Sequence, residues 1–155
     1  MHDLFKHIKI SNKIILLSLF AVFVTTMSNA EKSAEEIIKS RKALFSKNYN
    51  TAKKVQSLSS NGDFDESKTL MLEMSENYKK LKEMFPDNSK EGFKTESLPI
   101  IWDEKDAFNA LMQKASDDMI KLTSLIEETD NVKGTIGKLM WSNCKACHSK
   151  YRAPH

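Results

Sequence analysis

Cysteine and histidine are both scarce in this chain of 155 residues, which contains two of the first and four of the second. The two cysteines, Cys144 and Cys147, are three positions apart, so no structural disulfide between distant segments competes for them. A structural zinc site needs four ligands, and this region adds only His148 and the terminal His155. A thioredoxin-like redox pair needs alternating strands and helices, which the sequence lacks.

Only one long apolar run is present, and it lies at the N-terminus. A basic stretch (residues 6–13) precedes the run (residues 14–24), and a small-x-small cleavage site follows it (residues 28–30). The run is shorter than the ~20 apolar residues of a comfortable membrane span. We therefore expect residues 1–30 to be a cleavable signal peptide that exports residues 31–155, with an uncleaved anchor as the alternative.

The expected mature chain also lacks an excess of either charge. Without Asp3 and the three lysines of the signal region, 21 basic and 20 acidic residues remain of the 24 and 21 in the full sequence. This balance gives no reason to expect nucleic acid or an anionic membrane surface as a partner. The length, without repeats or low-complexity tracts, predicts a single domain over residues 31–155.

No segment alternates between apolar and polar residues over a useful length, so a sheet is not expected. Four segments instead have helical periodicity. The expected helices run from a capping box at Ser33 to Gly62, from about residues 63–65 to Pro86, from after a loop that ends near Pro99 to residue 126, and from a cap at Asp130 through Tyr151. Two of the three connections are short, which predicts an all-α, up-down-up-down antiparallel four-helix bundle.

The segment Cys144-Lys145-Ala146-Cys147-His148 is the most informative motif. Its C-x-x-C-H spacing is that of covalent haem attachment, in which two thiols add across the haem vinyl groups and the adjacent imidazole coordinates the iron. On a helix, the two cysteines and the histidine share one face. We predict one haem c per chain near the C-terminal helix, attached through Cys144 and Cys147, with His148 as the axial iron ligand. Such attachment takes place outside the bacterial cytoplasm, and so the expected location is the periplasm.

Residues 33–152 resemble the cytochrome c′ family of periplasmic haem proteins. Residues 144–152 are similar to the family's terminal C-x-x-C-H-x-x-aromatic-Arg pattern, and Ile101-Trp102 with Phe108 resembles the start of its third helix. The family is a four-helix bundle with a covalently bound haem, and its members are commonly homodimers.

The resemblance also assigns roles to individual residues around the haem. It implies that Arg41 contacts a haem propionate, that Thr95 and Glu96 border the haem, and that Arg152 lies beside the proximal face. It places Phe45 at the distal position, four residues after Arg41 on the same helical face. The sequence departs from the family at Lys42, where many members have glutamine.

Function depends on the sixth ligand of the iron. His155 follows His148 by seven residues and would lie on the wrong side to be a distal ligand. Low-spin relatives take a methionine from the first helix, but residues 31–61 contain none. Phe45 cannot bind iron. The methionines of the second and third helices are expected to fill the core: Met71, Met74, Met84, Met112 and Met119.

We therefore expect a five-coordinate haem with an apolar distal pocket and no evident hydrogen-bond donor. Such a pocket suits NO and CO, and the expected function is sequestration of NO by a redox-active haem protein. The alternative is a low-spin periplasmic electron carrier with a methionine sixth ligand and an unknown redox partner. A peroxidase would need a distal acid–base histidine, which is missing, so an enzyme is not expected.

Overall fold

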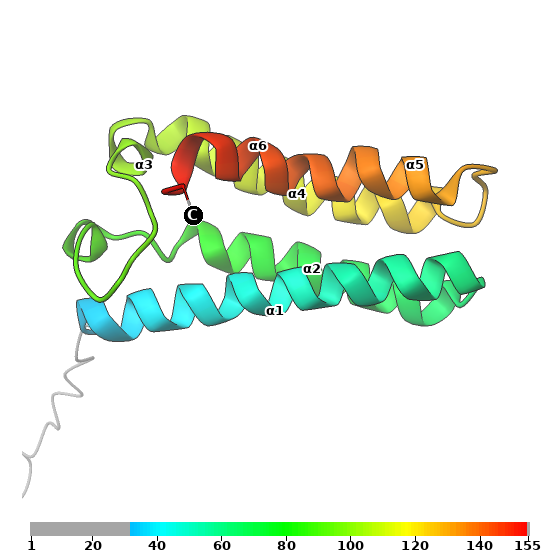
Figure 1. Ribbon diagram of the computed structural model, residues 1–155, viewed down its shortest axis with the longest axis horizontal. Coiled ribbons are helices and arrows are strands. Elements are labelled where there is room, and N and C mark those ends of the chain that lie inside the picture. Colours follow the sequence, from blue (N-terminus) through cyan, green and yellow to red (C-terminus); the bar gives the residue numbers. More distant parts are fainter. Residues whose placement is uncertain (1–31, 155) are drawn as a thin grey trace, which may run out of the picture. The chain divides into compact units, whose positions relative to one another are not determined.

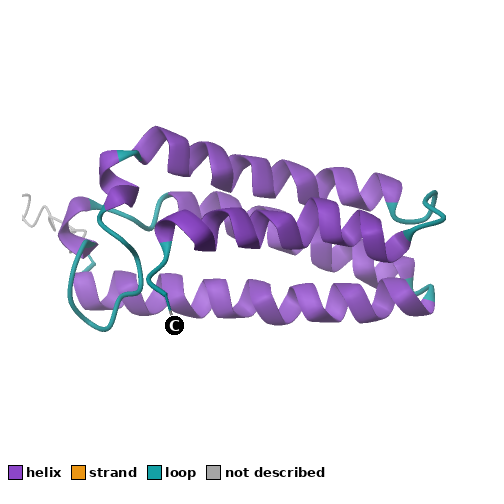
Figure 2. Ribbon diagram, turned by 45° about the horizontal axis from the view of Figure 1, so that its top comes forward, coloured by secondary structure: helices purple, strands orange, loops and turns teal. Residues whose placement is uncertain are grey.

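The computed structural model describes residues 32–154, and in that range four long helical segments form an antiparallel bundle (Figures 1 and 2). No strand occurs among these residues, apart from one isolated bridge between Ser97 and Arg152. The predicted all-α four-helix bundle is confirmed. The predicted signal peptide, residues 1–30, lies outside the described residues. The helices are α1 (Ala34–Asn61), α2 (Phe64–Lys82), α3 (Ile100–Asp103), α4 (Lys105–Leu125), α5 (Val132–Ile136) and α6 (Ser142–Tyr151).

The ends of α1 are those that the sequence predicts. The Ser33 hydroxyl accepts from the Glu36 backbone N–H at 3.3 Å, and the Glu36 carboxylate accepts from the Ser33 N–H at 2.9 Å. This reciprocal pair is a capping box, which satisfies donors that a helix N-terminus leaves free. At the other end Gly62 takes the left-handed conformation with φ of 84°, which a side chain would disfavour.

The fourth segment differs from the single regular helix that the sequence predicts. The cap is Asn131, whose Oδ1 accepts from the Gly134 N–H at 2.9 Å, so the prediction of Asp130 is wrong. A π-helical turn, Gly137–Trp141, separates α5 from α6. One residue added to a helical turn rotates everything after it by about 100°, because each residue of an α-helix turns by that amount. The turn therefore helps to set the direction in which the motif at residues 144–148 faces.

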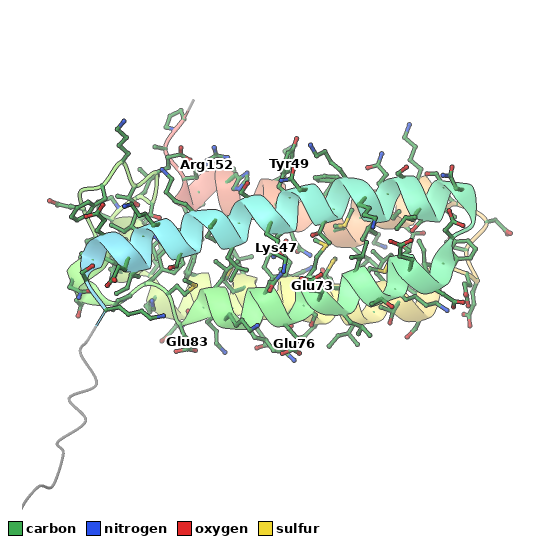
Figure 3. All side chains as sticks on the ribbon, turned by 90° about the horizontal axis from the view of Figure 1, so that it is seen from below. Lys47, Tyr49, Glu73, Glu76, Glu83 and Arg152 are labelled. Atoms are coloured by element: carbon green, nitrogen blue, oxygen red, sulfur yellow. The ribbon has the colours of Figure 1, made fainter. Side chains whose placement is uncertain are left out.

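Helix α2 packs against α1 on one side and α4 on the other, and α4 also contacts α6. At the surface, where α1 and α2 lie side by side, the side chains of Lys47 (α1) and Glu73 (α2) point toward each other and form an ion pair (Figure 3). Helix α1 meets α5 near one end of the bundle. The apolar core is rich in methionine: the predicted core residues Met71, Met74, Met112 and Met119 are buried, as is Met140, whereas Met84 is only partly buried. None of the helices in residues 32–154 is long and apolar enough to cross a membrane.

The connection between α2 and α3 is longer than the sequence predicts, because α2 ends at Lys82 rather than at Pro86. A short 3₁₀ turn, Asp87–Ser89, follows. The chain then passes through Gly92, with φ of 85°, and meets the end of α6. There the Leu98 N–H donates to the Tyr151 carbonyl at 3.0 Å, and the Ala153 N–H donates to the Glu96 carbonyl at 2.8 Å. These bonds fix the loop beside the C-terminal segment.

Candidate haem-binding site

A cavity of about 570 Å³ lies between α1, α2, α4, α6 and the loop before α3. This volume is within the range of cofactor and ligand pockets, roughly 300–1,000 Å³. Seven of the eight residues that the sequence analysis assigns to the site line this one cavity, although they are up to 111 positions apart. They are Arg41, Phe45, Glu96, Cys144, Cys147, His148 and Arg152. The eighth, Thr95, lies behind the wall.

The C-x-x-C-H motif forms the α6 wall of the cavity. Both cysteines are free thiols, and the Sγ atom of Cys144 is 4.0 Å from the Tyr78 hydroxyl oxygen. Burial raises the pKa of Cys144, and burial together with the neighbouring Cys144 raises the pKa of Cys147 to about 12. Both sulfurs are therefore protonated at neutral pH. Within residues 32–154, no group of three His, Cys, Asp or Glu side chains is arranged to hold a metal ion by itself.

Arg41 is a buried cation with only 1 % of its surface exposed. Its guanidinium donates to the Ser89 hydroxyl at 2.8 Å, the Ser89 carbonyl at 2.9 Å and the Thr95 hydroxyl at 2.7 Å. It also lies 4.6 Å from the centre of the Phe85 ring. None of these partners is a carboxylate. Burial lowers the pKa of Arg41 to about 10, which still leaves the group charged at neutral pH.

Two further charged residues at the cavity, Glu96 and Arg152, are paired with each other. The Nε atom of Arg152 donates to the Glu96 carboxylate at 2.9 Å. The nearby Lys42 ammonium donates to the Lys94 carbonyl at 2.8 Å and also lines the cavity. This end of the cavity thus holds more positive than negative charge.

The remaining wall is mostly apolar. Half-buried Phe45 of α1 contacts Phe85 edge-on, with ring centres 6.4 Å apart. The other apolar members come from α3, α4 and α6: Ile101, Phe108, Leu111, Met112, Ala115 and Tyr151. Of the five methionines considered as possible iron ligands, only Met112 lines this cavity. Trp102 packs against Phe85 outside it, with ring centres 5.8 Å apart.

Sequence reasoning missed several polar side chains of the wall: Ser46, Asn48, Tyr49, Tyr78, Ser97 and Asn143. The Asn143 amide donates to the Asp118 carboxylate and the Leu139 carbonyl, at 2.8 Å each, and is therefore satisfied. Asn48 could have been found, because it continues the helical face of Arg41 and Phe45 at the next turn. Tyr78 follows the core pattern of α2, which does not distinguish a cavity wall from the core.

Comparison with known proteins is decisive at this point, because the family model for cytochrome c′ matches residues 36–152. The chain belongs to the cytochrome c′ family. A curated cytochrome c′ from Rhodopseudomonas palustris is 29% identical over 147 residues, which cover 93% of each chain. The cofactor of the family is a covalently attached haem c, and the prediction of that cofactor is confirmed.

Solved cytochrome c′ structures have the same fold. The structure from Rhodopseudomonas palustris has a TM-score of 0.64 and 28% identity, and covers 76% of this chain and 96% of its own. The structure from Thermochromatium tepidum has a TM-score of 0.67, covering 81% of this chain and 100% of its own. At 18% identity, this second similarity concerns the fold alone. The cavity fits the cofactor by its volume, its apolar wall and its two free thiols beside an imidazole.

Proposed function

We propose that haem c occupies the cavity, with Cys144 and Cys147 as its attachment points and His148 as its axial ligand. When bound, the haem supplies an iron that binds small ligands and exchanges single electrons. The support is the position of all three side chains on one wall, close to each other and open to the same space. Both thiols are protonated at neutral pH, which is the form whose S–H bond adds across a vinyl group.

The charged end of the cavity suits the haem propionates. Arg41 is buried among neutral partners, and a buried cation is costly without an opposite charge. We place at least one propionate near Arg41, with Thr95 holding the guanidinium in position. Glu96 fixes Arg152 on the His148 side of the cavity through their ion pair.

The observation that carries the functional proposal is the position of Phe45 across the cavity from the motif. Phe45 lines it from α1, whereas His148 lines it from α6. A phenyl ring cannot coordinate iron, and its bulk keeps the opposite face clear of stronger ligands. The proposed state is a five-coordinate haem that binds NO and CO and sequesters NO. Among residues 32–154 no second histidine lines the cavity, so peroxidase-type acid–base catalysis is not proposed.

One observation favours a second candidate, the low-spin electron carrier. Met112 of α4 is a cavity-lining thioether and is only 2 % exposed. If its sulfur reached the iron, the haem would be six-coordinate and would exchange electrons with little rearrangement. Met112 also belongs to the apolar core beside Phe108 and Ala115, where a flexible side chain fills irregular space.

The setting proposed for this function is the periplasm, reached through cleavage of the expected signal peptide at residues 1–30. Haem c attachment takes place outside the bacterial cytoplasm, which supports that location. An unidentified periplasmic redox partner would reduce the iron, and assembly as a homodimer is proposed from the family resemblance. Neither nucleic acid nor a membrane is proposed as a partner.

Uptake of NO by the reduced protein tests the functional proposal. We expect one NO per chain to bind, because each chain has one cavity-bound haem with an open iron face. A titration followed by optical spectroscopy gives the stoichiometry. A reduced protein that keeps its spectrum when NO is added in excess would instead favour the electron carrier.

Replacing Cys147 by alanine tests the attachment. Cys147→Ala is expected to leave at most one thioether, to shift the optical spectrum and to allow haem to be lost more easily. Mass spectrometry of the denatured protein counts the bonds, and Ser149→Ala, an exposed change in the same helix, is the control. A Cys147→Ala protein that keeps the wild-type optical spectrum and holds its haem as firmly as the wild type would show that Cys147 is not an attachment point.

A further inference from the structure

The charged side chains of this protein are segregated along the sequence. Residues 37–62, which make up most of α1, and residues 131–155, which contain α5 and α6, together have 11 basic residues and no acidic residue. Residues 63–130 have 17 acidic and nine basic residues. The near-neutral balance of residues 31–155 therefore conceals two regions of opposite charge.

The two basic segments lie on the same side of the bundle. In Figure 1, α1, α5 and α6 are nearer the viewer, with α2 and α4 behind them. Figure 3 shows the same division from another direction, with Tyr49 and Arg152 at one edge of the bundle and Glu76 at the opposite edge. We call the exposed surface of residues 37–62 and 131–152 the basic face.

The haem cavity opens on the basic face. Among the described residues that line the cavity, the exposed ones all come from α1 and α6: Lys42, Ser46 and Tyr49 on one side and His148 on the other. The lining residues of α2, α4 and the loop before α3 are buried or half-buried. Because the rate of electron transfer falls steeply with distance, a redox partner exchanges electrons with the haem fastest when it binds to this face.

Much of the positive charge on the basic face is not neutralised by the chain itself. Some of its basic residues pair with carboxylates from outside the face, as Lys47 does with Glu73 of α2. Five exposed lysines of the face make no ion pair within residues 32–154: Lys42, Lys53, Lys133, Lys138 and Lys145. Exposed cations without a neutralising carboxylate give the surface a positive potential, which attracts an anionic partner.

Tyr49 joins the two halves of the basic face and is 55 % exposed. Its ring packs edge-on against Trp141, with ring centres 6.1 Å apart, and the Lys53 ammonium lies 4.7 Å from the ring centre. The Trp141 indole N–H in turn donates to the Gln56 side-chain oxygen of α1 at 2.7 Å. An exposed tyrosine that its neighbours hold in place, with charged residues around it, is typical of the centre of a protein–protein interface.

The composition of the basic face favours a protein over a membrane as the partner. Helices that bind a membrane surface insert a row of apolar side chains into it. The other large apolar side chains that are exposed within residues 32–154 lie outside the basic face: Leu72, Phe93 and Ile120. Tyr49 alone does not provide such a row.

We propose that the basic face is the docking surface for a redox protein whose own docking surface is acidic. The partner gives one electron to the oxidised haem iron, so the iron is reduced and the redox centre of the partner is oxidised, with no bond made or broken. The excess of carboxylates in residues 63–130 repels the same partner from the other side, which orients the encounter. The inference rests on the redox partner of the proposed function, but not on the coordination number of the iron.

Oxidation of the reduced protein by hexacyanoferrate(III), a small trianion that accepts one electron, measures the charge around the cavity opening. Residues 31–155 have one basic residue in excess, and the two haem propionates make the whole molecule slightly negative. Net charge alone therefore predicts a rate that rises with salt. The basic face predicts a rate that falls with salt, because salt screens the local attraction. A rate that rises with salt would contradict the inference.

Reversing two charges separates the basic face from net charge. The probe is reduced flavodoxin, a small acidic protein that gives one electron at a time. The double variant Lys53→Glu, Lys145→Glu is expected to slow its reduction of the oxidised protein by about tenfold at low salt. Neither lysine lines the cavity. If this variant folds poorly, Lys53→Gln with Lys145→Gln should slow the reaction by a smaller factor.

A second double variant, Lys80→Glu with Lys121→Glu, is the matched control. Both lysines are exposed, on α2 and α4, and their replacement makes the same change in net charge. The control should change the rate by less than about twofold, because a charge farther than a Debye length from the contact is largely screened. Hexaammineruthenium(II), a cationic reductant, should reduce the basic-face variant at least as fast as the wild type. Equal slowing of the flavodoxin reaction in both double variants would overturn the inference.

Other occupants of the basic face give different results. Folded basic-face variants that flavodoxin reduces at the wild-type rate overturn the inference. If such variants lose binding to phosphatidylglycerol vesicles, the face binds membranes; if they lose self-association in sedimentation, it is a contact between copies of this chain. A six-coordinate haem that does not bind CO would overturn the proposed function alone, because docking does not need an open iron position.

Discussion

Replacing Arg41 by methionine is expected to lower the free energy of unfolding by about 2–4 kcal/mol, because it removes several hydrogen bonds from a charged donor at a buried site. The guanidinium joins α1 to the loop before α3 through Ser89 and Thr95, and to the turn that follows α2 through the Met84 carbonyl at 3.3 Å. Methionine fills similar space but leaves these oxygens without donors. A buried cation is itself costly, and its removal offsets part of the loss. The expected loss of unfolding free energy is therefore smaller than the summed contributions of the hydrogen bonds.

Denaturant unfolding of the haem-loaded protein measures the effect, with Lys42→Met as the matched control. Lys42 is the next residue, is exposed, and donates only to the Lys94 carbonyl among the bonds described. Its replacement should change the unfolding free energy by no more than about 0.5–1 kcal/mol. Equal losses in the two variants would mean that the Arg41 hydrogen bonds do not stabilise the loop. Arg41→Lys should recover little of the unfolding free energy lost in Arg41→Met, because an ammonium group cannot reproduce the planar hydrogen-bonding geometry of the guanidinium.

Phe45→Ala is expected to speed CO binding to the reduced protein by about tenfold or more, which corresponds to a barrier lower by at least ~1.4 kcal/mol. The ring is proposed to stand over the open iron face, and CO must displace it. The same change weakens the fold, by less than the ~3–5 kcal/mol of a fully buried Phe→Ala, because Phe45 is half-buried. Faster binding and lower stability therefore occur together.

Stopped-flow CO binding measures the rate, and Leu44→Ala separates the two effects. Leu44 is also half-buried on α1 and packs against the core, but it does not line the cavity. Leu44→Ala should reduce the stability of the protein without changing the rate of CO binding. An unchanged rate in folded Phe45→Ala protein would mean that Phe45 is only a packing residue and that another group limits access.

Sequence patterns predicted the helices where local rules determine them. The capping box at Ser33 and the left-handed Gly62 depend only on neighbouring residues, and both are as predicted. The cap at Asn131 and the π-helical turn Gly137–Trp141 were missed. An Asp and an Asn in succession are both good caps, and tertiary packing selects between them. A π-helical turn leaves no mark in a periodicity analysis that assumes regular helix.

The candidate site likewise contains residues that the local sequence identifies and residues that only the packed helices bring together. The motif at residues 144–148 could be predicted because its chemistry is local in sequence. The partners of Arg41 could not, because Ser89 and Thr95 are 48 and 54 residues away and show no pattern of their own. The spacing of Asn48 from Arg41 and Phe45 could be read from the sequence, but its burial and its bond with Asn77 become visible only when α1 and α2 are packed together.

The coordination number of the iron in the reduced protein near neutral pH tests the central claim most directly. Resonance Raman spectroscopy reports it through the spin- and coordination-sensitive haem modes. A cavity in which Phe45 is opposite His148 predicts a five-coordinate, high-spin haem that changes on addition of CO. A six-coordinate, low-spin spectrum would contradict the account, and a return to high spin in Met112→Leu would identify the sixth ligand.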